Sequence, residues 1–367
     1  WSRALITKIK TGSVDEPTVK DVAIFTGGND TQYDDGSVPA EADRTGNAIY
    51  AVDLQSGDLL WSATSGASAS HSESSLIIPE MDHAIPTNIT AMDMDADGTM
   101  DRFYAIDIMG QIFRVDFNNK EGTEDNKRYV PDGRLYANLA SGDRRFYNPV
   151  NAAVSQVGAE YRIHLNVGSG RRPNPLNRTS SDQFYSVIDR KVFEDNLPPT
   201  DELPVVQISD LVNTTTSISL DHDYKGWYFN LAETGEKVLS KASARGGFVF
   251  FTSYVPPEPL DPNAQVCEPP LGTGYLYAIY LGDSGALDND RRIRLQPSGI
   301  PASPMFLTLE QNPPDNPDLE DPYTSQDSKT VLLVGTEMPK LDNEDAQNTL
   351  ENALNKTAEK VYWQKLK

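Results

Sequence analysis

The apolar positions of this chain fall in short runs, and one of these runs recurs along the sequence. It reads IYAVDLQSGDLLW at residues 49–61, FYAIDIMGQIFRVD at 103–116 and LYAIYLGDSG at 276–285, with a weaker form, FYSVID, at 184–189. In each full copy an aromatic and β-branched run meets a turn that contains Gly, and a second strand is expected within a few residues. The pattern therefore predicts β-hairpins. Where an Asp precedes the turn, its carboxylate can accept hydrogen bonds from the turn amides.

Hairpins that recur at intervals of tens of residues are typical of a β-propeller, in which each blade contains one. The intervals here are uneven, so long loops must be inserted between blades. A β-sandwich is the competing prediction, although it has less reason to repeat one sequence. Three acidic, Pro-rich segments are expected to be surface loops, because Pro lacks a ladder N–H and acidic side chains are poorly buried. These segments lie near residues 193–206, 255–271 and 308–328.

The end of the chain has a different pattern. Residues 343–360 place Leu350, Ala353, Leu354 and Ala358 at helical spacing, which predicts a short helix. Residues 361–363 then resemble a closing strand. The sequence as a whole predicts an all-β fold with one short C-terminal helix, organised as a single domain over residues 1–367.

Composition narrows the classes of function. The formal charge is −22, from 54 acidic and 32 basic residues, so the surface should repel nucleic acid and attract cations. No stretch reaches 18 apolar residues, and we expect no membrane insertion. The first residue is Trp1 rather than Met, which is expected of a fragment or a processed form. Cys267 is the only cysteine, so a disulfide within the chain is excluded, while a partner outside it stays open.

One segment carries the chemistry of a metal site. Residues 93–101 read DMDADGTMD, with carboxylates at positions 1, 3, 5 and 9 and Gly98 at position 6, where a sharp turn is required. This is the pattern of a Ca²⁺ loop, since Ca²⁺ takes six to eight oxygen ligands from alternating positions. The predicted ligands are the side chains of Asp93, Asp95, Asp97 and Asp101, with Asp101 bidentate, and the backbone carbonyl of Thr99.

Two features define this predicted site further. Tyr104 stands where helix-loop-helix sites have a bidentate Glu, so the loop is predicted to lie on a β scaffold. Without a cation, four carboxylates around one turn should strain or disorder it. The alternative interpretation is a solvated acidic turn.

No catalytic residues are predicted. The sequence has no Gly-x-Ser-x-Gly elbow and no phosphate-binding loop, and we expect no enzyme. A quinoprotein dehydrogenase is the main enzymatic alternative, because residues 51–61 resemble the hairpins of such propellers. Those enzymes repeat the Trp-containing phrase in most blades, whereas only the copy that ends at Trp61 has it here.

Several phrases, in order along the chain, resemble the PilY/PilC proteins, which are tip-associated components of type IV pili. The resemblance extends to about Thr336, and Ala4 replaces a Pro that is usual in the family. The matching phrases are WS at 1–2, FTGGND at 25–30, residues 47–61, the loop 93–101 with Arg102, Phe103, Tyr104, Asp107, Gly110 and residues 114–116, GSGRRP at 168–173, DQFY at 182–185, KGWY at 225–228, GEKV at 235–238, FFT at 250–252, Cys267, GTG at 272–274 and GIPASP at 299–304.

This resemblance implies a modified, seven-bladed-like propeller. Family members carry further blades upstream of Trp1, so this chain is not expected to close the ring by itself. It also implies a pilus-tip protein at the bacterial cell surface, exported through the periplasm and outer membrane. The implied roles are Ca²⁺-dependent control of pilus extension against retraction, twitching motility and cell adhesion, with minor pilins and host or abiotic surfaces as partners. A generic secreted adhesin module with purely structural Ca²⁺ stays the alternative.

Overall fold

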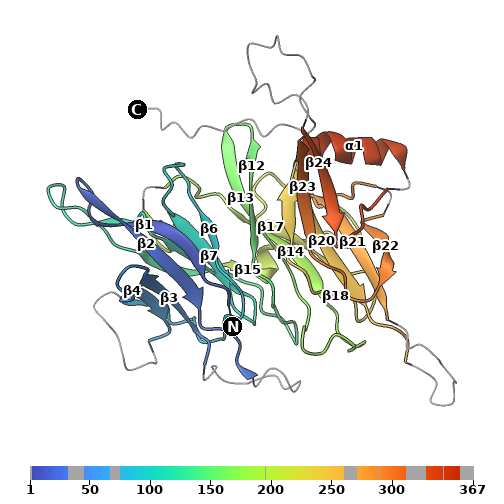
Figure 1. The fold of residues 1–367 in the computed structure, drawn as a ribbon, viewed down its shortest axis with the longest axis horizontal. Coiled ribbons are helices and arrows are strands. Elements are labelled where there is room, and N and C mark those ends of the chain that lie inside the picture. Colours follow the sequence, from blue (N-terminus) through green and yellow to red (C-terminus); the bar gives the residue numbers. More distant parts are fainter. Residues whose placement is uncertain are drawn as a thin grey trace, which may run out of the picture.

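The computed structural model describes residues 2–31, 45–66, 75–194, 196–259, 271–288, 290–310, 328–341 and 343–355. In these ranges the chain forms five β-sheets and one α-helix. The sheets follow one another in chain order from one end of the molecule to the other (Figure 1). The prediction of an all-β fold is therefore confirmed.

The first two sheets are formed by residues 5–138, with the short strand β15 added from residues 206–207. The first has the strand order β5-β4-β3-β2-β1-β10-β9, and the second β15-β11-β8-β7-β6. The strands are β1 (Leu5–Ser13), β2 (Pro17–Thr26), β3 (Ala48–Asp53), β4 (Leu59–Thr64), β5 (Ser75–Ile77), β6 (Thr90–Met92), β7 (Arg102–Ile106), β8 (Gln111–Asp116), β9 (Lys120–Glu121), β10 (Arg128–Tyr129), β11 (Asp132–Asn138) and β15 (Val206–Gln207).

The remaining sheets are formed by strands between residues 151 and 334. The third has the order β12-β13-β14-β17-β16, the fourth β18-β20-β21-β22 with β19 also on β20, and the fifth is the hairpin β23-β24. The strands are β12 (Asn151–Val157), β13 (Glu160–Gly168), β14 (Gln183–Asp189), β16 (Val212–Asn213), β17 (Gly226–Asn230), β18 (Lys237–Val238), β19 (Ser243–Arg245), β20 (Phe248–Val255), β21 (Thr273–Tyr280), β22 (Arg292–Ser298), β23 (Pro304–Glu310) and β24 (Ser328–Val334).

Each sheet packs its face on the next one, and each junction has its own apolar core. Trp61 of the first sheet lies in one cluster with Phe103 of the second, and Tyr104 on the opposite face of the second sheet lies in a cluster with Tyr185 of the third. Phe184 of the third sheet stacks on Phe251 of the fourth, with ring centroids 3.8 Å apart. The result is a curled stack of sheets that is compatible with a propeller-like fold. Seven blades are not seen in the described ranges.

The three full copies of the repeated phrase form hairpins. Residues 49–61 give β3 and β4, and residues 103–116 give β7 and β8. The third copy gives β21, which pairs antiparallel with the next strand, β22, as predicted, although β22 begins only at Arg292. A positive φ at Ser284 and a single bridge from Ile279 to Ala286 reverse the chain first. The weaker copy forms β14, the central strand of the third sheet.

The C-terminal helix α1 (Glu344–Asn355) begins where it was predicted. The side-chain oxygen of Asn343 accepts the backbone N–H of Asp345 at 2.9 Å and caps the first turn. Leu350, Ala353 and Leu354 are buried against the fourth and fifth sheets, which confirms their assignment to the apolar face. Ala358, Cys267 and the expected strand at 361–363 lie outside the described residues, as do most of the loops near 255–271 and 308–328.

In the described residues near 193–206 no regular strand forms before β15 begins at Val206, and Leu197 and Leu203 of this segment are buried in a core cluster. The described ranges also contain no helix with the length and apolarity needed to cross a bilayer.

The turn between β7 and β8 has a buried acid that should make stability depend on pH. Asp107 is fully buried, and its Oδ1 accepts the N–H groups of Met109, Gly110 and Gln111 at 2.8–2.9 Å. Burial raises the pKa of Asp107 to about 7. The folded state therefore binds this proton more tightly than the unfolded chain, where the pKa is about 3.9. The free energy of unfolding should fall as the pH rises from about 4 to about 7.

We expect the variant Asp107→Asn to show a shallower fall over this pH range in urea denaturation. Asp53 occupies the same place in the first hairpin, but there Lys20 and the amides of Gln55 and Ser56 lower the pKa. The stability that Asp53 contributes is fully present above the pKa of the unfolded chain, about 3.9, and is lost only below that pH. The variant Asp53→Asn should therefore leave the slope of the unfolding free energy between pH 4 and 7 unchanged. An equal slope in wild type and Asp107→Asn would contradict the prediction.

Candidate metal centre

The predicted Ca²⁺ loop connects β6 to β7 in the second sheet. β6 and β7 pair antiparallel, with Met92 opposite Arg102 at the base of the loop. The turn requires left-handed backbone at Gly98 (φ 86°), as the sequence predicts, and also at Ala96 (φ 59°). The loop is thus carried on two adjacent strands rather than on helices, in agreement with the predicted β scaffold.

The structure brings three of the predicted ligands together. Carboxylate oxygens of Asp93, Asp95 and Asp101 lie within 4.8 Å of one another. Asp93 and Asp95 are exposed, whereas only 2% of Asp101 is. Hard carboxylate oxygens at this spacing form a donor set suited to Ca²⁺.

Asp101 has the environment expected of a residue that binds a cation. Its Oδ2 accepts the backbone N–H of Met94 at 2.6 Å, and among the described residues no donor bonds its other oxygen. Burial, together with the charges of Asp95 and Asp93, raises the pKa of Asp101 to about 6, against the opposing effects of the Met94 bond and the Lys10 charge. A buried carboxylate with so little compensation is costly. The residues present therefore fit a bound cation.

The other two predicted ligands, Asp97 and Thr99, are hydrogen-bonded to each other. Oδ1 of Asp97 accepts both the N–H of Thr99 at 2.9 Å and its hydroxyl at 2.6 Å. Oδ2 of Asp97 forms an ion pair with Lys10 of β1. Although burial acts to raise it, these bonds from Lys10 and Thr99 lower the pKa of Asp97. Asp97 is thus engaged by other partners and does not join the three converging carboxylates.

The loop was expected to be strained or disordered without a cation, and the structure shows how part of its repulsion is relieved. Asp97 N–H donates to Asp93 and Asp95 at 3.2 Å, and Gly98 N–H donates to Asp93 at 2.9 Å. The ammonium of Lys10 adds a positive charge from the first sheet. Sequence reasoning missed Lys10, because its place in β1, more than 80 positions earlier, gives no local signal.

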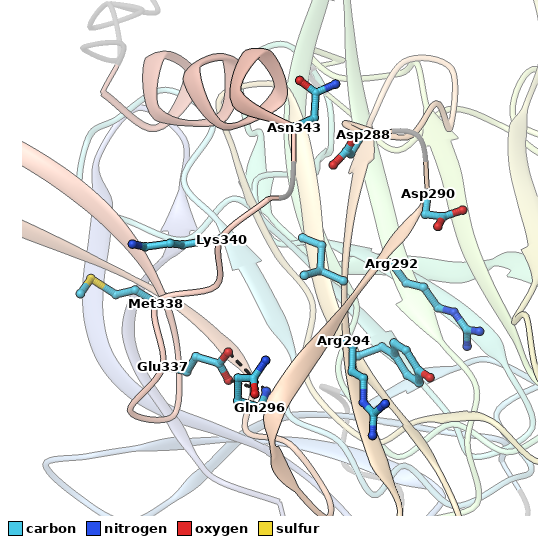
Figure 2. Close-up of a pocket in the computed structure, with 11 residues that line it drawn as sticks. Asp288, Asp290, Arg292, Arg294, Gln296, Glu337, Met338, Lys340 and Asn343 are labelled. Atoms are coloured by element: carbon cyan, nitrogen blue, oxygen red, sulfur yellow. Dashed lines mark hydrogen bonds between the residues drawn. The ribbon is translucent and has the colours of Figure 1, made fainter.

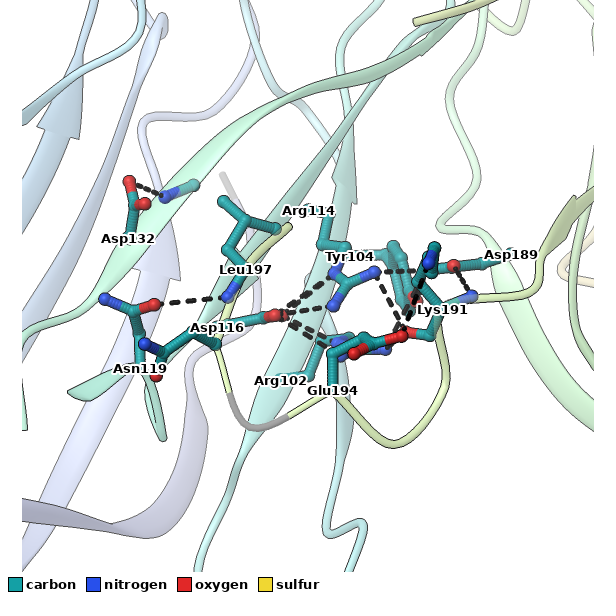
Figure 3. A network of polar contacts seen from close by, with 12 residues as sticks. Arg102, Tyr104, Arg114, Asp116, Asn119, Asp132, Asp189, Lys191, Glu194 and Leu197 are labelled. Atoms are coloured by element: carbon teal, nitrogen blue, oxygen red, sulfur yellow. Dashed lines mark hydrogen bonds and ion pairs between the residues drawn. The ribbon is translucent and has the colours of Figure 1, made fainter. Parts of the chain in front are cut away.

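A buried ion network anchors the strand that follows the loop (Figure 3). Arg102 and Arg114 both donate to the carboxylate of Asp116, with shortest distances of 2.6 Å. Arg114 also pairs with Asp189 at 3.0 Å, and Tyr104 donates to the same oxygen of Asp189 at 2.6 Å. At most 1% of any of the four charged residues is exposed.

This network is neutral overall, with two cations and two anions. Burial opposes charge on Arg114, but Asp189 and Asp116 raise its pKa. Likewise, burial opposes charge on Asp116, and Arg102 and Arg114 lower its pKa. Because Asp189 lies on β14, the network also ties the second sheet to the third. Arg102 directly follows Asp101, so the last residue of the predicted Ca²⁺ loop is attached to a strand that this network holds in place.

A second candidate binding site is a cavity of about 890 Å³ beside β22 (Figure 2). Its lining includes Arg292, Arg294 and Gln296 from β22, and Glu337 and Lys340 from the segment after β24. The backbone N–H of Gln296 donates to the Glu337 carboxylate at 3.2 Å. The lining mixes both signs of charge without a cluster of metal ligands or an acid–base pair, so the loop at 93–101 remains the stronger candidate.

Comparison with known proteins gives a structural match only. No protein-family model matches the sequence, and no curated protein matches it. Among solved structures, the crystal structure of the PilY1 C-terminal domain of Pseudomonas aeruginosa is similar, with a TM-score of 0.55 over 92% of this chain and 71% of that chain. The sequence identity is 11%. The chain therefore has a PilY1-like fold, which agrees with the resemblance seen in the sequence.

Proposed function

We propose that this chain is a non-enzymatic, calcium-binding domain of a type IV pilus tip protein. The proposal of a metal site rests mainly on the convergence of the Asp93, Asp95 and Asp101 carboxylates. Asp101 is buried, and its negative charge is only partly compensated by its neighbours. The pilus role is supported by the similarity to the PilY1 C-terminal domain. Ca²⁺ would supply the positive charge that the loop lacks, with Asp97 and the Thr99 carbonyl completing the ligand set.

The proposed role includes pilus biogenesis, control of extension against retraction, and surface attachment. Its proposed partners are minor pilins and host or abiotic surfaces, and its proposed location is the bacterial cell surface. The loop supports a regulatory part in this role, because its end is attached to the ion network that joins two sheets. A change of charge at the loop would thereby act on a strand that packs in the centre of the molecule.

A second candidate is an adhesin module in which Ca²⁺ is only structural. The internal hydrogen bonds of the loop favour it, since a loop that is already folded gains little new order from a cation. Affinity separates the two, because extracellular structural sites bind at about 10⁻⁴–10⁻³ M and responsive sites at about 10⁻⁷–10⁻⁵ M.

Calorimetric titration of the purified chain with Ca²⁺ tests the metal site. We expect saturable binding at one site, and no detectable heat would remove calcium from the proposal. The pilus role needs a separate test in the source bacterium, where the chromosomal Asp101→Asn variant should alter the number of surface pili and twitching motility. Normal piliation and motility in a strain whose protein has lost Ca²⁺ binding would refute a regulatory role.

A further inference from the structure

The strand β1 of the first sheet brings a cation into the loop of the second sheet. The ammonium of Lys10 forms an ion pair with Asp97 and lies 3.7 Å from Oδ2 of Asp95. Its side chain is 18% exposed. The neighbouring lysines Lys8 and Lys20 instead pair with Asp21 and Asp53 of their own sheet. Lys10 is therefore placed against two of the predicted Ca²⁺ ligands by the packing of two sheets.

Lys10 and a metal ion need the same oxygen atoms. Asp97 has one oxygen bonded to Thr99 and the other paired with Lys10, so neither is free to bind a cation while both contacts last. Ca²⁺ requires six to eight oxygens at about 2.3–2.6 Å, and an ammonium group cannot share that shell. Full coordination by the loop thus requires the Lys10 side chain to leave.

From this geometry we propose that Lys10 is a built-in, displaceable counter-ion of the loop, which lowers its affinity for Ca²⁺. The inference rests on the proposed function of the same site. With Lys10 in place, the loop is held to β1 by the ion pair and by the bond from Met100 N–H to the Lys8 carbonyl at 2.7 Å. Exchange of Lys10 for Ca²⁺ removes the first of these contacts. Occupancy of the loop is in this way coupled to the contact between the first and second sheets.

The variant Lys10→Met tests the proposal, because it keeps the length and apolar stem of the side chain and removes its charge. Removal of the two competing pairs, with Asp97 and Asp95, should tighten Ca²⁺ binding by about 3- to 10-fold in calorimetry, which corresponds to about 0.7–1.4 kcal/mol. In EGTA the same variant should melt at a lower temperature than wild type. It should also show a larger rise in melting temperature when Ca²⁺ is added.

Two control variants isolate the charge at this position. Lys8→Met removes a lysine of the same strand that pairs with Asp21 of its own sheet, and Lys10→Arg keeps the charge and also controls for folding. Both should bind Ca²⁺ with about wild-type affinity. In wild type, hydrogen exchange measured by mass spectrometry across residues 5–13 should increase on Ca²⁺ addition, and Lys10→Met should show a smaller increase.

The outcomes separate this inference from the proposed function. If wild type binds Ca²⁺ and a folded Lys10→Met binds it no more tightly, the inference is wrong and the proposed metal site stands. If neither chain binds Ca²⁺, both are wrong. Binding by Lys10→Met alone would support Lys10 as a competitor and would remove calcium from the function of the natural chain.

Discussion

Replacement of Arg114 by Met should lower the free energy of unfolding by about 3–5 kcal/mol. Arg114 is fully buried and donates to both Asp116 and Asp189. Its removal leaves two buried carboxylates with one cation, Arg102, which lies 3.8 Å from Asp189. The loss comes mainly from that uncompensated charge, because a complete buried ion pair is itself only weakly stabilising relative to apolar residues.

Urea denaturation of wild type and Arg114→Met measures this effect. Arg128→Met is the matched control, because Arg128 is exposed on the short strand β10 and its replacement should change stability by less than about 0.5 kcal/mol. Addition of Asp189→Asn to Arg114→Met should recover part of the loss, since one cation and one anion are then removed together. A loss below about 1 kcal/mol for Arg114→Met would show that the network does not stabilise the junction of the two sheets.

The variant Asp101→Asn should weaken Ca²⁺ binding by about 100-fold or more. The change keeps the size of the side chain and an oxygen that can accept the Met94 N–H. It removes the negative charge and the bidentate geometry that a carboxylate gives to Ca²⁺, and a charge-assisted contact is about twice as strong as a neutral one. The buried position of Asp101 increases the effect, because solvent screens it poorly.

Calorimetric titration of this variant beside wild type provides the measurement. Asp125→Asn is a suitable control, since Asp125 is an exposed acid outside the loop and its loss changes the net charge by the same amount. Because burial disfavours the charge of Asp101, the metal-free variant should be at least as stable as wild type at neutral pH. Wild-type affinity in Asp101→Asn would mean that the loop does not hold Ca²⁺ through this residue.

Local pattern accounts for the elements that the sequence predicted correctly. The hairpins at residues 49–61 and 103–116 each contain their own strands and turn, and an Asp accepts amides of the turn in both. The helix from Glu344 likewise depends on apolar spacing and on the Asn343 cap. The third copy also forms a hairpin, but its second strand begins only at Arg292, because a short apolar run with a Gly turn does not fix how far away its partner strand begins.

The candidate ligands likewise divide into those that local spacing predicted and one whose contact depends on the packing of sheets. The spacing of Asp93, Asp95 and Asp101 around Gly98 predicted one group of carboxylates, and the structure brings these three together. The pairing of Asp97 with Lys10 did not follow from that spacing. It arises because β1 packs beside the loop, and such a contact depends on the arrangement of two sheets.

By itself, the sequence determined that this protein is an all-β chain with a short helix and an acidic loop of Ca²⁺ type. Periodicity and turn chemistry operate over a few neighbouring residues, so they can be read without a structure. Tertiary structure alone decided which charges meet across sheets. Lys10 reaches Asp97, and Arg114 reaches Asp189, because residues far apart in sequence meet where the sheets pack together. Arg114 and Asp189 are fully buried there, where an unpaired charge would be costly, whereas Lys10 and Asp97 stay partly exposed.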